Sequence, residues 1–149
     1  MKNPRTVHEI LDMLEDYHRQ RGRRYERLAG KVHDPNVRIL LQHLGQLERE
    51  SVDVIHDEAE NTSPAVATYL NFGPSLDPDA VHANDCRCGA EPSVEDVVVC
   101  ALTADPTLDE LLDRLAGCTA APSVASLAER LQALELTKRQ KISKYTRND

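Results

Sequence analysis

Apolar residues recur along the first third of the chain at the three-to-four-residue spacing of helices that bury one face. The first run predicts a helix that ends near Ala29, because Gly30 is free to adopt the positive φ common just after a helix. A second helix follows, since Asp34 can cap its first turn and Pro35 suits its first position. The predicted buried stripes are Val7, Ile10, Leu11, Leu14, Tyr17, Tyr25 and Leu28 in the first helix, and Val37, Leu40, Leu41, Leu44, Leu47, Val54 and Ile55 in the second.

The last third of the chain has the same pattern. Gly117 is expected to end a third helix, and Ser123 or Thr119 can cap a fourth. The third helix should kink or break at Asp105-Pro106, because proline disfavours helical geometry at the residue before it. The predicted stripes are Val94, Val97, Val98, Ala101, Leu108, Leu112 and Leu115, then Val124, Leu127, Leu131, Leu134 and Ile142.

The two patterns are related by an offset of 87 residues. Between residues 27–55 and 114–142, eleven of 29 aligned positions are identical without a gap. Upstream, Thr6 and Ser93 both suit a hydroxyl cap with an acidic residue three positions later. The chain therefore contains two copies of one helical hairpin. The identical pairs are Arg27/Arg114, Leu28/Leu115, Ala29/Ala116, Gly30/Gly117, Pro35/Pro122, Val37/Val124, Leu40/Leu127, Leu44/Leu131, Leu47/Leu134, Glu48/Glu135 and Ile55/Ile142.

The segment between the hairpins is rich in Pro, Asp, Ala, Asn and Gly, and it is long enough to travel the length of a bundle. We predict one all-α domain over residues 1–149, with a hairpin at 6–60, a crossover at 61–92 and a hairpin at 93–146. Two hairpins joined by one long crossover is the topology of ferritin-like four-helix bundles. A bundle with only short connections is the rival topology.

Composition and charge restrict the function. The 149 residues carry a net charge of -7, which argues against a nucleic-acid binder because phosphate neutralisation needs a basic face. No segment approaches eighteen consecutive apolar residues, and the first ten residues lack an apolar stretch of signal-peptide length. We therefore expect no membrane association and a cytoplasmic protein, with its four cysteines present as thiols.

The segment from Tyr25 to Ala29, a short turn, and an apolar helix ending in Leu47-Glu48 together resemble the ferritin-like superfamily, especially its rubrerythrin and bacterioferritin branches. The resemblance covers residues 6–55 and 93–142. It implies a di-iron or di-manganese centre held by one Glu from each of two helices and by Glu-x-x-His from each of the other two.

Carried onto this chain, those ligand positions are degenerate. The Glu-x-x-His positions fall on Glu48 and Glu135, but Ser51 and Lys138 replace the two histidines. The lone glutamates fall on His18 and Asp105. Folding each hairpin about its turn brings these residues to similar levels, so we expect a buried polar layer.

Three hypotheses explain these residues. His18, Glu48, Asp105 and Glu135 could bind a metal pair. Alternatively, Lys138 places its ammonium between Asp105 and Glu135 while Arg21 reaches Glu48, so that side-chain cations replace the metal charge. A third hypothesis places the residues at a solvated end of the bundle. We favour the second, with Arg21, Ser51 and Lys138 in the polar layer, because a lysine at a ligand position repels a divalent ion and removes a donor.

This hypothesis implies a non-catalytic ferritin-like protein without a cofactor, with a structural or protein-interaction role in stress response or beside another protein. The alternative is a di-iron or di-manganese oxidoreductase that handles peroxide, oxygen or iron, with Tyr25 as a nearby hydrogen-bond donor. We also expect a homodimer formed through an outer helix face. In the crossover, His82, Cys86 and Cys88 are candidates for a zinc or thiol site, although the paired clusters of a typical zinc site are missing from the sequence.

Overall fold

The computed structural model of the chain describes residues 7–61, 91–102, 106–117 and 122–146. These residues form five α-helices and a short 3-10 helix, and no strand occurs in these ranges. The all-α prediction is therefore confirmed. The helices are α1 (Val7–Ala29), α2 (Pro35–Asn61), α4 (Val94–Leu102), α5 (Pro106–Ala116) and α6 (Pro122–Ser143), followed by η2 (Lys144–Thr146).

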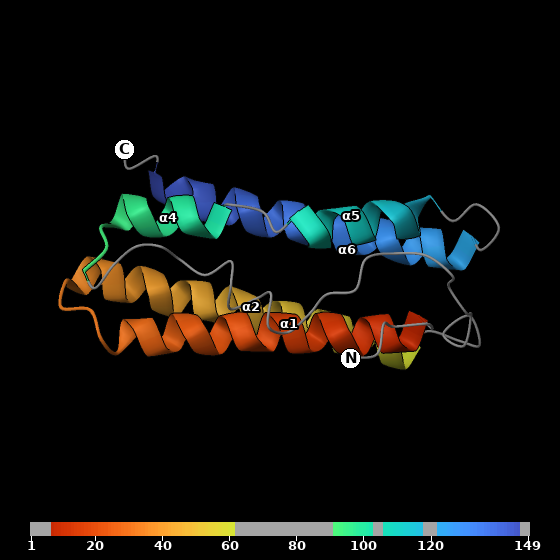
Figure 1. Cartoon of the computed structure of the whole chain (residues 1–149), viewed down its shortest axis with the longest axis horizontal. Coiled ribbons are helices and arrows are strands. Elements are labelled where there is room, and N and C mark those ends of the chain that lie inside the picture. The colour runs from red at the N-terminus through yellow and green to blue at the C-terminus, as the bar shows by residue number, and fades with distance from the viewer. Residues whose placement is uncertain (1–6, 62–90, 103–105, 118–121, 147–149) are drawn as a thin grey trace.

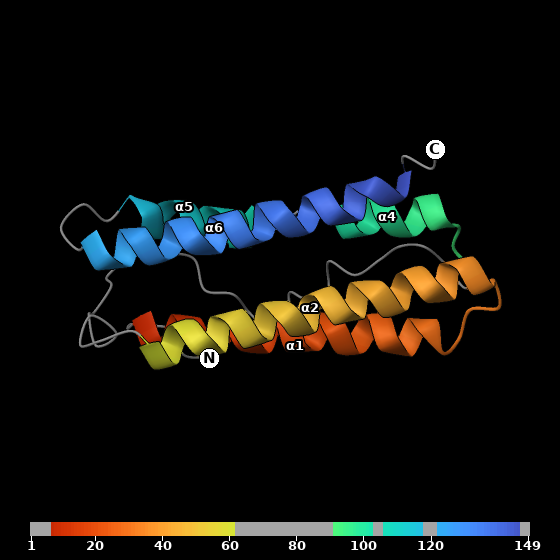
Figure 2. The same ribbon diagram turned by 180° about the vertical axis from the view of Figure 1, so that it is seen from behind.

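The helices lie in two layers along the long axis of the molecule (Figure 1). α1 and α2 run antiparallel and form one layer, and α4 and α5 follow one another along α6 in the other (Figures 1 and 2). α2 contacts both α4 and α6 across the layers. Side chains from α1, α2 and α6 therefore meet inside the molecule.

The predicted caps at Asp34 and Ser93 are confirmed. Asp34 Oδ1 accepts a hydrogen bond from the Asn36 N–H at 2.9 Å, with Pro35 as the first residue of α2. Ser93 Oγ accepts from the Asp96 N–H at 3.1 Å, and Asp96 Oδ2 accepts from the Ser93 N–H at the same distance. This reciprocal pair is a capping box, and it fixes the start of α4.

α4 ends at Leu102 and α5 begins at Pro106, beside the predicted kink or break; residues 103–105 lie outside the described residues. Gly30 and Gly117 follow the last residues of α1 and α5 as predicted, but neither has the positive φ that we expected. Instead the Gly30 N–H still donates to a carbonyl four residues earlier, at 3.2 Å. The N–H groups of Lys31 and Val32 then both donate to Leu28, which closes the end of α1 without a left-handed residue.

The buried apolar residues form two clusters, one toward each end of the molecule. The first cluster joins α1, α2, α5 and α6, and the second joins α1, α2, α4 and α6. The first contains Val7, Ile10, Leu11, Leu14, Tyr17, Ile55, Leu108, Leu111, Leu112, Leu115, Val124, Leu127, Ala128 and Leu131. The second contains Tyr25, Ala29, Val32, Val37, Leu40, Leu41, Leu44, Leu47, Val97, Val98, Ala101 and Ile142.

The predicted stripes agree with these clusters at most positions. Leu28, Val94 and Leu134 are only partly buried. The prediction for Val54 is wrong, since 39% of this residue is exposed. The neighbouring Ile55, 1% exposed, takes the buried position on this turn of α2.

Candidate functional site

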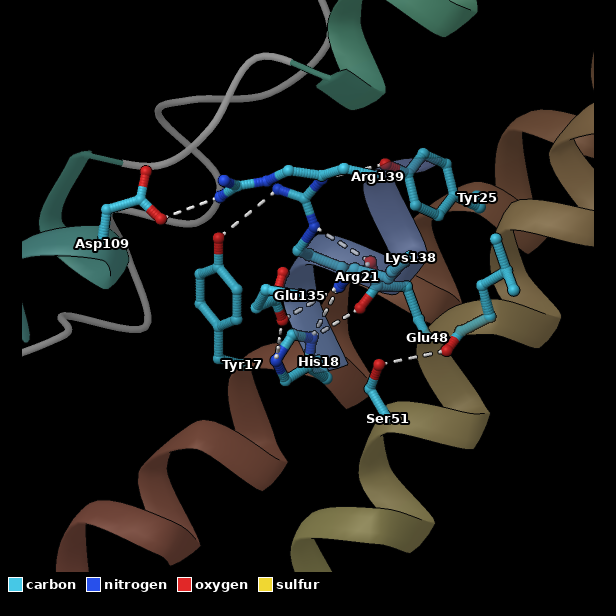
Figure 3. A network of polar contacts seen from close by, with 11 residues as sticks. Tyr17, His18, Arg21, Tyr25, Glu48, Ser51, Asp109, Glu135, Lys138 and Arg139 are labelled. Carbon is cyan, nitrogen blue, oxygen red and sulfur yellow. Dashed lines mark hydrogen bonds and ion pairs between the residues drawn. The ribbon is translucent and has the colours of Figure 1, made fainter. Parts of the chain in front are cut away.

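A polar layer separates the two apolar clusters, where the apolar stripes of three helices are interrupted. α1 contributes His18 and Arg21, and α2 and α6 contribute two residues each (Figure 3). Only Arg21 in this group is not fully buried, with 20% of its side chain exposed. We define the polar layer as His18, Arg21, Glu48, Ser51, Glu135 and Lys138.

Lys138 joins the two carboxylates of the layer. Its Nζ lies 3.1 Å from Glu48 Oε1 and 3.2 Å from Glu135 Oε1. Glu48 comes from α2, whereas Glu135 lies one turn before Lys138 on α6. One ammonium therefore balances carboxylates from both layers of the fold.

His18 lies between the same two carboxylates. Its Nδ1 is 2.6 Å from Glu48 Oε2, and its Nε2 is 3.2 Å from Glu135 Oε1. Lys138 Nζ also comes within 3.5 Å of Nδ1. The two ring nitrogens of His18 therefore face carboxylates of α2 and α6, so this residue links α1 to both helices.

Arg21 approaches the layer from its more exposed side. Its Nε lies 3.5 Å from Glu48 Oε1, and its Nη2 donates to the Tyr25 hydroxyl at 2.9 Å. Nη1 is 3.5 Å from the Tyr17 hydroxyl. The guanidinium carbon is 5.7 Å from the centroid of the Tyr17 ring and 5.8 Å from that of Tyr25, so both rings add cation–π contacts.

The electrostatics of the layer favour its ionised form. Burial alone would raise the pKa of Glu48, but Lys138, His18 and Arg21 together hold that pKa well below its usual range. Burial also opposes ionisation of Glu135, yet mainly Lys138 and then His18 lower the pKa of Glu135 to about 2. Burial would lower the pKa of Lys138, but the two carboxylates raise it. The layer is thus a set of mutually stabilised charges.

Two glycines inside the helices bring α1 and α2 close together beside the layer. A Cβ added at Gly22 would lie 3.3 Å from the Glu48 Cβ and 3.5 Å from the Gly45 carbonyl oxygen. We did not predict a role for either glycine. The available signal is that each interrupts a predicted helix, where glycine is unfavourable unless a neighbouring backbone must come close.

The structure brings together most of the residues singled out in the sequence. Arg21 reaches Glu48 as expected from the favoured hypothesis, and Lys138 contacts Glu135. The contact of Lys138 with Glu48 was not expected. The hypothesis of a solvated end is wrong, since Glu48 is 2% exposed and lies between the two apolar clusters.

Ser51 is buried, but its Oγ donates to the Leu47 carbonyl at 3.2 Å rather than to a carboxylate. Asp105, the expected second carboxylate partner of Lys138, lies outside the described residues. His82, Cys86 and Cys88 also lie outside them. Tyr25 does lie beside the layer, where its hydroxyl accepts a hydrogen bond from Arg21.

Among the residues that the structure describes, no group of three or more His, Cys, Asp or Glu side chains has a geometry suited to a metal ion. In the same part of the chain, no helix has the length and apolar character needed to cross a membrane. Comparison of the chain with models of protein families, with curated proteins and with solved structures gives no match.

Proposed function

We propose that this protein is a ferritin-like four-helix bundle in which internal cations replace a di-metal centre, and that it acts as a structural or protein-interaction module rather than as an oxidoreductase. The buried ammonium of Lys138 carries the proposal. It lies 3.1 Å and 3.2 Å from the two glutamates that occupy the Glu-x-x-His positions of the ferritin-like pattern. A divalent ion bound by both glutamates would need the same space and would be repelled by the ammonium.

The helix bounds support an internal repeat. α1 begins at Val7 and α4 at Val94, while α2 begins at Pro35 and α6 at Pro122; both pairs differ by 87 residues. The same offset relates Glu48 to Glu135 and Ser51 to Lys138. Ser51 of the first hairpin, which donates to a carbonyl of its own helix, is thus the counterpart of Lys138 in the second hairpin.

The donor set does not fit a pair of metal ions. Carboxylates and imidazoles are good ligands for iron and manganese, but here Glu48 already contacts His18, Arg21 and Lys138. Displacing Lys138 from this buried carboxylate to admit an ion would leave the ammonium without its partner. The layer is therefore best described as a closed ion-pair network that joins the two hairpins.

The alternative function is a di-metal oxidoreductase that acts on peroxide, oxygen or iron. One observation favours it: His18, Glu48 and Glu135 converge from three helices, with the His18 nitrogens 2.6 Å and 3.2 Å from the two carboxylates. In this case Lys138 would have to swing away before an ion could bind.

Metal analysis distinguishes the two functions. The full-length protein is purified without chelator, incubated anaerobically with Fe²⁺ or with Mn²⁺, desalted and analysed for bound metal and for a shift in thermal unfolding temperature. We expect no stoichiometric metal and no shift for the wild type. Two ions per chain, the stoichiometry of a di-metal centre, together with loss of binding in Glu48→Ala, would overturn the proposal.

The variant Lys138→His provides a matched positive test, because it restores the Glu-x-x-His spacing on α6. Under the proposal, removing the ammonium allows weak metal binding that the wild type lacks. Under the alternative, the wild type already binds metal and the variant only raises the occupancy. Peroxide consumption by the iron-incubated wild type would also support the alternative.

A further inference from the structure

The outer face of α1 carries charges of opposite sign on its two halves. Asp12 and Asp16 lie on the first half, and Arg23 and Arg27 on the second. Their spacing places all four on the side of the helix opposite its buried residues. Asp12, Arg23 and Arg27 are exposed and Asp16 is half-buried. α1 lies along the outer edge of its layer in Figure 1, so this face is directed away from the second hairpin.

The four charges are arranged symmetrically about the middle of the helix. Asp16 and Arg23 are equally distant from the point between residues 19 and 20, and so are Asp12 and Arg27. Two copies of α1 packed antiparallel about a twofold axis at that point would place Asp12 opposite Arg27 of the second copy. Asp16 would lie opposite Arg23 of the second copy, and each contact would occur twice.

The two arginines are available for such contacts. Among the described residues, neither Arg23 nor Arg27 forms an ion pair with a carboxylate. Asp12 pairs with His8, with 3.7 Å between His8 Nε2 and its Oδ2, and Asp16 Oδ2 accepts a hydrogen bond from Gln20 Nε2 at 2.7 Å. Arg19, which would lie near the twofold axis, is already paired with Glu15 at 3.1 Å, so its charge is balanced within its own chain.

In the rest of the first hairpin, acidic and basic residues are likewise separated between the two ends. Residues 7–18 and 50–61 lie at one end because α1 and α2 are antiparallel, and together they carry nine acidic residues and no Lys or Arg. Residues 19–49 carry eight Lys or Arg and three acidic residues. An antiparallel pair of hairpins brings unlike ends together, whereas a parallel pair brings like ends together.

We propose that the outer face of α1 binds a second copy of this chain in an antiparallel, salt-sensitive dimer. The argument is independent of the polar layer, which lies on the opposite side of α1. Exposed ion pairs are individually weak and are screened by salt, and the net charge of -7 opposes association at long range. The dimer should therefore form at high protein concentration and low salt, and dissociate as salt is added.

Sedimentation velocity on the full-length protein at about 0.01 M and about 1 M salt tests this proposal. We expect Asp12→Arg and Arg27→Asp each to weaken the dimer by at least about tenfold, because each replaces two attractive contacts with two repulsive ones. The double variant Asp12→Arg/Arg27→Asp should dimerise again. An equimolar mixture of the two single variants should form a heterodimer, since each supplies the charges that the other lacks.

Two exposed residues on α6 provide controls with the same change in net charge. Glu129→Arg matches Asp12→Arg, and Lys141→Asp matches Arg27→Asp. Circular dichroism checks that every variant remains folded. A wild type that stays monomeric at low salt and high concentration would overturn the proposal. So would controls that weaken the dimer as much as the α1 variants, or a double variant that fails to recover.

Discussion

Lys138 donates to Glu48 at 3.1 Å across 90 residues of sequence, and this bond joins α6 to α2 between the two apolar clusters. Neither group could be buried alone at acceptable cost, because an uncompensated charge in an apolar interior is strongly unfavourable. Each group therefore depends on the other. Correct packing of the two hairpins places both in reach, and incorrect packing would leave two buried charges without partners.

Replacing Lys138 by Met should destabilise the protein strongly at neutral pH. The substitution nearly preserves the volume of the side chain but removes the cation that balances Glu48 and Glu135. Breaking a buried ion pair on one side costs about 3 to 5 kcal/mol, which urea unfolding followed by circular dichroism would measure. Lys141→Met on the exposed side of α6 is the control, and it should change the free energy of unfolding by less than about 0.5 kcal/mol.

The double variant Lys138→Met/Glu48→Gln tests whether the loss comes from charge rather than from packing. It removes one negative and one positive charge from the same ion pair. We expect it to be more stable than Lys138→Met alone, giving a favourable coupling energy in a double-mutant cycle. Simple addition of the two single losses would show that the residues contribute independently.

Stability should fall in acid because of the layer. The pKa of Glu135 is lowered from 4.5 to about 2, burial being outweighed by Lys138 and His18. The unfolded chain therefore takes up the proton first, so this contribution is complete above pH 4.5 and is lost as the pH falls toward 2. It amounts to about 3 kcal/mol, and unfolding curves over this range would measure it. Glu135→Gln should flatten the profile, whereas Glu129→Gln on the exposed face should not.

Arg21→Lys should not substitute for the wild-type residue, although it keeps the positive charge. The guanidinium contacts the Tyr25 hydroxyl, the Tyr17 hydroxyl and Glu48 from three different nitrogens. A single ammonium cannot reproduce that spread. We expect a loss of about 1 to 2 kcal/mol in the free energy of unfolding, the cost of two hydrogen bonds. Arg23→Lys on the exposed face of α1 is the control, and an equal loss there would contradict this explanation.

Much of the fold could be predicted from the sequence because its signals are local. Apolar spacing marks each helix, Asp34 and Ser93 start helices through hydrogen bonds to residues two or three positions away, and Pro106 starts α5 where the helix was expected to break. The polar layer was predicted from the ligand positions that the ferritin-like resemblance implies, once each hairpin is folded about its turn. Its partners were less certain, since the contact of Lys138 with Glu48 depends on how two distant hairpins pack.

The close approach of α1 and α2 could not be predicted in the same way. Gly22 lies on α1 and Gly45 on α2. Whether the two glycines face each other depends on how far α2 is shifted along α1 after the turn. Whether Val54, at the edge of the apolar stripe of α2, is buried could not be predicted from spacing alone either. Its spacing is compatible with burial, but the rotation of α2 in the packed molecule gives the buried position to Ile55.

The two glycines should respond differently to alanine, which tests whether the close approach constrains the polar layer. Alanine is more favourable than glycine inside a helix by about 1 kcal/mol, so helix propensity alone would make each variant more stable than the wild type. At Gly45 the new Cβ meets Glu26 Cγ at 3.3 Å, but that side chain is exposed and pairs with the exposed Arg49 rather than with a buried group. At Gly22 it meets the Glu48 Cβ at 3.3 Å, and Glu48 is held by His18 and Lys138.

We therefore expect Gly45→Ala to be as stable as the wild type or more stable by up to about 1 kcal/mol. Gly22→Ala should be less stable than Gly45→Ala by at least about 1 kcal/mol, because its gain is offset by displacement of Glu48 from its ion pairs. Chemical denaturation of the two variants side by side measures this difference. If Gly22→Ala proved the more stable of the two, Glu48 could shift freely, and the view of the layer as a rigid link between the hairpins would be wrong.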